Sequence, residues 1–327
     1  MITKRQLSIL NAIVEDYVEL GQPIGSNTIL QRHDVNVSPA TIRNEMKLLE
    51  TKNLIEKTHS SSGRIPSEAG FRLYANRLLN EPIEANKQNY ISMYDMYTKH
   101  HFDISSTLNH FAKVFSNQSH YTTLVVGPDH SKVALLDIKL LKVHDHHLVI
   151  VLIYETGHIK QLHLSSSQPI SQSSVIRMSN YVSELARSNI NQTFHPQYLD
   201  AHDFSSDEYD ILFKVYQLIH QQLSSESARI YLGGKHQLID ALNEHNVAAI
   251  QPILKYIESN QITALIDDNL DSAINIKIGR DIEKNINDIA ILTRRYHIDH
   301  GLNGYVAVIG PTAMHYQNVI QLLSRIS

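Results

Sequence analysis

The chain has 327 residues, which is enough for two or three domains, and its net charge is −4. It contains no cysteine, which excludes disulfides, cysteine-ligated metal centres and cysteine nucleophiles. The first 80 residues hold ten Lys or Arg against eight Asp or Glu, and the remainder holds 19 against 25. Because this asymmetry is mild, any binding to nucleic acid must depend on where the basic side chains lie rather than on bulk charge.

The hydropathy pattern argues against a membrane protein. The longest candidate apolar run, residues 148–154, is far too short to cross a bilayer. The N-terminal residues also lack the apolar core of a signal peptide. We therefore expect a cytoplasmic protein with no membrane partner.

Three short helices are predicted at the N-terminus. Apolar residues recur every three or four positions across residues 4–20, and Gly21 ends that helix. Ser26 is the next N-cap candidate and would open a short second helix to about Arg32. Ser38 can cap a third helix, with Pro39 in its first turn, where the missing N–H of proline costs nothing.

The third helix has one apolar and one polar side. Ile42, Met46 and Leu49 recur at helical spacing and predict a buried face. The opposite side carries polar or small residues: Ala40, Asn44, Lys47 and Thr51, with Arg43 beside them. Asn and Arg can bond base edges bidentately, and Lys can meet phosphates. An ordinary solvated helix face would carry the same residue types, so this helix alone does not decide between the two interpretations.

A β-hairpin is predicted next, with strands at 54–58 and 64–65 around a turn of small residues. Such a turn can approach a phosphate backbone closely, and Arg64 could enter a minor groove. Three helices followed by a hairpin are typical of a winged-helix DNA-binding domain. The candidate DNA-binding residues are Ser38, Thr41, Arg43, Asn44, Lys47, His59, Ser60, Ser61, Gly63 and Arg64.

The rest of the chain alternates between strand and helix patterns. Strands at 122–126, 133–143, 147–154 and 159–164 predict an antiparallel meander. Helices are predicted at 174–189 and 209–223, and strand patterns return from residue 274 onward. A sheet that begins before Ser165 and is completed after Ala273 predicts one α+β domain interrupted by an insertion.

The two inserted helices have broad apolar faces. These faces are wider than packing on one sheet should need. We therefore expect a homodimer to bury the remaining apolar surface through Val182, Leu185, Val215, Leu218 and Ile219.

No catalytic or cofactor site is expected. His144, His146 and His147 flank a turn beside Asp145 and could bind a metal, but turn histidines are usually solvated, so we expect no metal. The run Gly233-Gly234-Lys235 lacks the spacing of a phosphate-binding loop, and no hydrolase or dinucleotide motif is present. An enzyme is therefore not expected.

Four runs of the sequence resemble the HrcA family of heat-inducible transcription repressors. They are residues 38–46, 61–67, 70–74 and 304–316. The match reaches both ends of the chain. One departure is Asn53, where the family usually has Gly, but Asn tolerates the left-handed backbone that a turn would need.

The resemblance implies a layout and a function. The layout is a winged helix (1–80), a linker helix (81–102), a GAF-like α+β domain (103–170 and 231–327) and an inserted helical dimerisation domain (171–230). The implied function is repression of chaperonin and Hsp70 operons. A dimer would bind the inverted repeat called CIRCE, and the chaperonin would modulate its activity.

Two alternatives remain open at this point. In one, the GAF-like domain binds a metabolite that sets DNA affinity, because a fold does not by itself fix a function. In the other, the winged helix docks onto a protein and does not bind DNA.

Overall fold

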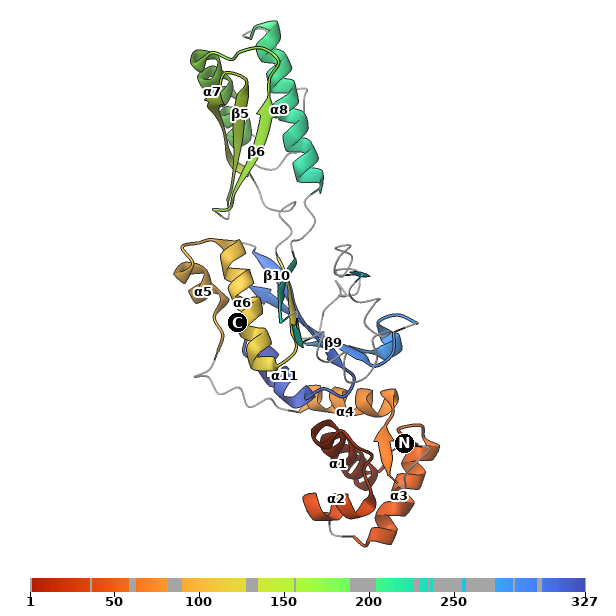
Figure 1. Ribbon diagram of the computed structural model, residues 1–327. Coiled ribbons are helices and arrows are strands. Elements are labelled where there is room, and N and C mark those ends of the chain that lie inside the picture. The colour runs from red at the N-terminus through yellow and green to blue at the C-terminus, as the bar shows by residue number, and fades with distance from the viewer. Residues whose placement is uncertain are drawn as a thin grey trace.

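The structure is a computed structural model with the mixed α+β fold that the sequence predicts (Figure 1). It describes residues 2–35, 37–58, 63–81, 90–127, 135–155, 157–188, 204–225, 230–234, 236–237, 255–256, 274–284, 286–298 and 302–326. These residues form three modules that follow one another along a long axis (Figure 1).

The N-terminal module contains four helices and one hairpin. They are α1 (Lys4–Leu20), α2 (Ser26–Arg32), α3 (Pro39–Thr51), β1 (Ile55–Lys57), β2 (Arg64–Pro66) and α4 (Glu68–Asn80). The first three helices and the hairpin follow the order that the sequence predicts. Gly21 ends α1 at a φ of 65°, which glycine adopts without strain. Asn53 adopts the expected left-handed backbone, with a φ of 57°.

Side-chain caps fix where α3 and α4 begin. The Ser38 hydroxyl accepts a hydrogen bond from the Thr41 amide (3.2 Å), and the Ser67 hydroxyl accepts one from the Gly70 amide (3.1 Å). Each cap satisfies an amide that has no partner inside its helix. The start of α2 differs from expectation, because Gly25 occupies the cap position and Ser26 is already helical.

The five-stranded module is built on an antiparallel sheet of order β7-β3-β10-β9-β8. Its strands are β3 (Thr122–Val126), β7 (Ile230–Gly233), β8 (Asn275–Ile278), β9 (Ile289–His297) and β10 (Asn303–Pro311). The described residues of this module include the helices α5 (Met93–Lys99), α6 (Ile104–Ser119) and α11 (Tyr316–Ser324). Val126 lies opposite Tyr305 across the sheet. A strand before Ser165 therefore pairs with one beyond Ala273, as expected.

The hydrophobic core of the five-stranded module continues into the N-terminal module. Val125, Leu292 and Val306 on one face of the sheet share a cluster of buried side chains with Leu10 and Phe71 of the N-terminal module. The other face, around Leu124 and Ile291, has a smaller cluster of its own.

The three-stranded module has a separate sheet and a separate core. It consists of β4 (Leu135–His144), β5 (His147–Tyr154), β6 (Ile159–Ser165), α7 (Gln172–Ser188) and α8 (Ser206–Ser225). The sheet order is β4-β5-β6, so these strands form the expected meander, but β3 is not part of it. Our expectation that the strands before Ser165 share a sheet with β8–β10 is wrong for β4, β5 and β6, and Ile170 lies in the core of this module.

Packing on helix α7 explains why these strands form their own unit. The amide of Leu140 donates to the Ser179 hydroxyl (3.0 Å), and the Ser183 hydroxyl donates to the carbonyl of Ile138 (2.6 Å). Helix α7 therefore covers the strand edge of β4 that β5 leaves open, and an edge with satisfied backbone groups does not recruit another strand.

The segment between the first two modules is only partly as expected. We expected a linker helix over residues 81–102, and the structure has helix α5 over Met93–Lys99. Residues 82–89 of that prediction lie outside the described residues. Among the helices that the structure describes, none is long and apolar enough to cross a membrane.

Candidate nucleic-acid interface and domain junction

Helix α3 presents a polar face to solvent. Ile42, Met46 and Leu49 are buried in the core of the N-terminal module, which fixes the helix about its axis. The opposite side is therefore exposed, and it carries Asn44 and Lys47. Neither of these two side chains has a hydrogen bond or ion pair to any residue in the described part of the chain. Both are available to a partner.

The other candidates on α3 already make contacts within the chain. Arg43 is exposed, and its Nε donates to the Ser26 hydroxyl of α2 (3.2 Å). Ser38 caps the helix, and the Ser38 and Thr41 hydroxyl oxygens lie 2.9 Å apart. Arg43 therefore helps to hold α2 against α3, and Ser38 and Thr41 shape the helix start.

The candidates in the hairpin fall into two groups. His59, Ser60 and Ser61 lie outside the described residues. Gly63 is buried, and a Cβ at that position would lie 2.8–2.9 Å from atoms of Pro23. This close approach, not exposure to DNA, explains the glycine.

Arg64 does not reach outward as expected. Its Nε and Nη2 lie 2.9 Å and 2.8 Å from one carboxylate oxygen of Glu50, near the end of α3. Its backbone also pairs with Ile24, with N–O distances of 2.8 Å and 2.9 Å. Arg64 therefore connects the hairpin to helix α3 and to the loop before α2. The sequence pattern missed this role because Glu50 is an unremarkable residue of an amphipathic helix.

The N-terminal module is joined to the five-stranded module by an aromatic cluster. Tyr316, at the start of α11, lies with its ring centroid 6.3 Å from that of Phe71 and 6.4 Å from that of Tyr74, both in α4. Burial raises the pKa of the Tyr316 hydroxyl, which donates to the carbonyl of Thr312 (2.8 Å). Residue 316 belongs to the C-terminal run singled out in the sequence, so that run has a structural role at the junction.

An arginine completes the contact between the two modules. The Arg72 guanidinium donates from Nε to Asp281 (2.8 Å) and from Nη2 to the carbonyl of Ile278 (3.2 Å). Both partners lie more than 200 positions further along the chain. Helix α4 is therefore fixed to the end of β8 as well as to α11.

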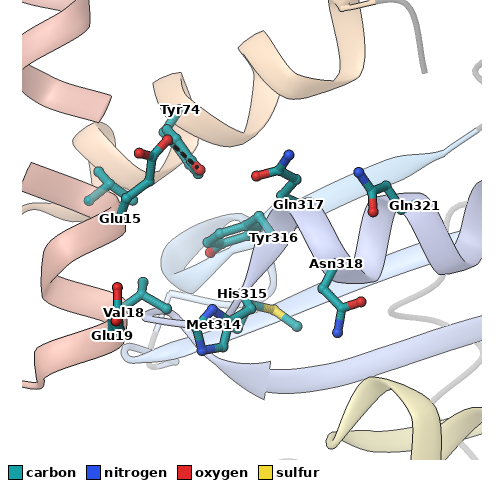
Figure 2. Close-up of a pocket in the computed structure, with 11 residues that line it drawn as sticks. Glu15, Val18, Glu19, Tyr74, Met314, His315, Tyr316, Gln317, Asn318 and Gln321 are labelled. Carbon is teal, nitrogen blue, oxygen red and sulfur yellow. Dashed lines mark hydrogen bonds between the residues drawn. The ribbon is translucent and has the colours of Figure 1, made fainter. Parts of the chain in front are cut away.

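A cleft of about 390 Å³ lies beside this junction, between α1, the side chain of Tyr74 and the start of α11 (Figure 2). Figure 2 shows Glu15 hydrogen-bonded to the Tyr74 hydroxyl, which donates over 3.2 Å. Burial is the main cause that raises the pKa of Tyr74, and the Glu15 carboxylate adds to it. His315 and the amide side chains of Gln317 and Asn318 form the facing wall.

The proposed dimer residues are placed differently from expectation. Val182, Val215 and Ile219 are fully buried in the core of the three-stranded module of their own chain. Leu185 and Leu218 are half-buried. The broad apolar faces of α7 and α8 are therefore explained by packing within one chain, and the three buried residues offer no surface to a second copy.

The sheet of this module also carries exposed apolar side chains. Every second residue of β5 is buried against the helices, so the intervening Val149, Val151 and Ile153 lie on the other face and are half-buried. Leu141 is paired with Val149, and Ile159 is paired with Ile153; their side chains are 53% and 56% exposed. We call these five residues the open sheet face.

The comparisons with known proteins agree on one family. Residues 105–320 match the family described as "HrcA protein C terminal domain". The chain is 47% identical over 326 residues to the heat-inducible transcription repressor HrcA of Staphylococcus epidermidis strain RP62A, 49% over 329 residues to that of Staphylococcus haemolyticus, and 48% over 328 residues to that of Staphylococcus aureus strain N315. Each alignment covers 100% of both chains.

A solved structure has the same fold. It is a crystal structure of a hypothetical protein, with a TM-score of 0.62 and 20% identity, covering 99% of this chain and 96% of that one. The curated relatives are transcription repressors and not enzymes. The chain therefore belongs to the HrcA family of heat-inducible transcription repressors.

Proposed function

We propose that this heat-shock transcriptional repressor binds double-stranded DNA in the cytoplasm through its N-terminal module, acting as a winged helix. Helix α3 would enter the major groove, with Asn44 on a base edge and Lys47 on a phosphate. The observation that carries the proposal is the exposed, unengaged pair Asn44 and Lys47 on a helix whose other side is buried. The same two residues argue against a module that only docks onto protein.

The test is binding of the full chain to labelled DNA that carries the inverted repeat, compared with scrambled DNA at several salt concentrations. The proposal expects tight, salt-dependent binding to the repeat and weaker binding to scrambled DNA. Equal affinity for the two DNAs would contradict specific recognition, and no binding to either would contradict the proposed role of the module.

The operator and the oligomer are linked by symmetry. An inverted repeat presents two equivalent half-sites, so a two-fold symmetric homodimer would match it. We assign the dimer contact to the open sheet face in place of the buried residues of α7 and α8. Its support is the exposure of Leu141 and Ile159, because exposed apolar side chains gathered on one face mark interaction sites.

Sedimentation of Leu141→Glu and Ile159→Glu tests this contact. A charge within the open sheet face should produce monomers that retain the fold. Phe213→Glu, which places the same charge at an exposed residue of α8, is the matched control and should remain dimeric. If both sheet variants remained dimeric, the dimer interface would lie elsewhere on the protein.

Dependence on the chaperonin is the proposed link to heat. Strand β10 lies between β3 and β9, so β3 has no partner on that side until the chain beyond residue 303 is available. Late closure of such a long loop leaves apolar strands exposed, and chains of this kind are prone to aggregate. Refolding yield and DNA affinity should rise with chaperonin and ATP, and added unfolded protein should reverse the gain. Full recovery without chaperonin at heat-shock temperature would contradict this link.

Control by a small molecule is the second candidate. It is favoured by the cleft between α1 and α11, because a ligand there would contact two modules at once. A thermal-shift screen of metabolites, followed by DNA binding with each hit, would decide. A hit that changes DNA affinity supports this candidate, and a screen with no hits argues against it.

A further inference from the structure

Two histidines face each other on the sheet of the three-stranded module. His147 begins β5 and His163 lies on β6, with Nε2 of His147 only 3.0 Å from Nδ1 of His163. Their ring centroids are 5.2 Å apart, with 29° between the ring planes. Val149 lies directly opposite His163, so the two histidines are diagonal neighbours on one face.

The two strands that carry this pair are held in place by buried neighbours. Leu148 and Leu164, the residues that follow each histidine, are buried in the core of the module and are paired across the two strands. The histidine side chains are therefore held close together by the sheet itself.

The polar side chains at the turn between β4 and β5, next to this pair, already make contacts within the chain. Asp145 makes an ion pair with Lys142 (2.7 Å), which lowers the pKa of its carboxyl group. His146 places Nδ1 3.1 Å from the carbonyl of Ser166, so that nitrogen carries the proton and donates. His144 is exposed, with its ring centroid 6.5 Å from that of His147. The facing pair is thus His147 and His163, and His163 was not among the turn residues that the sequence suggested.

We propose that His147 and His163 chelate a divalent transition-metal ion such as Zn²⁺. Imidazole nitrogen binds Zn²⁺ at about 2.0–2.1 Å, so two nitrogens 3.0 Å apart can both reach one ion after a small rotation of the rings. Without metal, only one proton can lie between the two nitrogens, and the ion replaces that proton. Imidazole is a ligand type that suits Zn²⁺, Cu²⁺ and Ni²⁺.

The site is a two-residue site with open positions. No group of three or more metal-ligating side chains is found in the described ranges of the chain, so water would complete the coordination. The ion would join β5 to β6 next to the β4–β5 turn. It would raise the free energy of unfolding of the three-stranded module by RT ln(1 + c/Kd), where c is the free metal concentration, so the gain grows with the logarithm of that concentration.

Calorimetric titration of the untagged full-length chain with Zn²⁺ tests the proposal. One site should be observed, and His147→Ala and His163→Ala should each weaken it at least about tenfold, because a single remaining imidazole cannot chelate. His146→Ala is the matched control, because His146 lies at the β4–β5 turn and its Nδ1 donates to the carbonyl of Ser166. Both sites of mutation are at the surface, and circular dichroism with EDTA present checks that each variant folds.

Electron paramagnetic resonance with Cu²⁺ gives a second readout. The spectrum should carry splitting from two imidazole nitrogens in the parent and from fewer in each single variant. Unchanged Zn²⁺ affinity in His163→Ala would overturn the proposal. So would a parent protein that binds Zn²⁺ no more tightly than the variant in which both His147 and His163 are replaced by Ala. The pair lies on the face that we assign to the dimer, but these experiments measure metal binding and not self-association, so the two proposals fail separately.

Discussion

Arg64 of the hairpin and Glu50 of α3 are joined by two guanidinium contacts to one carboxylate oxygen, at 2.9 Å and 2.8 Å. The Arg64 side chain is only 17% exposed. The pair therefore fixes the hairpin relative to the helix proposed to read DNA.

This arrangement makes a prediction that separates positioning from direct contact. Arg64→Ala should weaken DNA binding, and Glu50→Ala should weaken it as well, although it removes a negative charge near the DNA. The two changes should be non-additive, with a coupling of about 0.5–1 kcal/mol, because the pair is partly solvated. Fluorescence anisotropy with the two single variants and the double variant measures it. Tighter binding by Glu50→Ala would show that Arg64 is held back from DNA by Glu50.

Asn44 and Lys47 should differ in the kind of affinity that they supply. Asn44→Ala should cost about 1–3 kcal/mol on the inverted repeat and little on scrambled DNA, because a base contact carries the sequence information. Asn76→Ala, which removes an exposed amide from α4 of the same module, should bind like the parent. If both DNAs lost affinity equally, Asn44 would be a phosphate contact.

Lys47→Ala should instead weaken binding to both DNAs and reduce the slope of log affinity against log salt by about one. Lys99→Ala in α5 removes the same charge from another module and should leave the slope unchanged. A slope that does not change in Lys47→Ala contradicts a phosphate contact at this residue.

The aromatic junction should be a large contributor to stability. Tyr316 is 1% exposed and contacts both Phe71 and Tyr74, so Tyr316→Ala should lower the free energy of unfolding by about 3–5 kcal/mol. Tyr316→Phe keeps the ring and loses only the hydrogen bond to Thr312, so it should cost about 0.5–1.5 kcal/mol. Tyr94→Ala, at a residue that is 45% exposed, should change little. Urea titrations provide the values, and equal losses in the two Tyr316 variants would contradict a packing role for the ring.

Glu208 should make the three-stranded module sensitive to acid. Burial alone would raise the pKa of this carboxyl group, but hydrogen bonds from the Ser205 amide (3.0 Å) and from Arg177 outweigh burial and lower the pKa to about 2. A pKa lower in the folded than in the unfolded chain adds stability above the ordinary value of 4.5. That stability is lost as the pH falls from 4.5 toward 2.

Thermal melting between pH 6 and pH 2.5 measures this effect. Glu208→Gln should melt at a lower temperature than the parent at pH 6, and the difference should shrink as the pH falls. A constant difference across this range would mean that the hydrogen-bond geometry, and not the charge, is what matters at residue 208.

Local features were predictable from the sequence because their causes are local. Ser38 and Ser67 begin helices through hydrogen bonds to amides three residues away, and the spacing of Ile42 and Met46 fixes the buried side of α3. The exposed position of Asn44 follows from the same spacing. These features need no information about distant parts of the chain.

Features that depend on distant partners were not predictable. The apolar residues of β3 and β4 predict two strands but do not indicate their partners, which are β10 for β3 and β5 with α7 for β4. The broad stripe around Val215 fits burial within a chain as well as burial between chains. The Arg72–Asp281 contact joins residues 209 positions apart, and no local pattern indicates it.

The contact of Tyr316 with Phe71 and Tyr74 makes the placement of the N-terminal module depend on α11, a helix that is synthesised much later. A ribosome has made all of α1 to α4 long before it reaches codon 316. Until then the module has its own helices and hairpin, but it lacks the contact with Tyr316 of α11. A chain that stops before residue 316 thus lacks the aromatic contact and keeps the Arg72 contacts with β8 and Asp281 to place the N-terminal module.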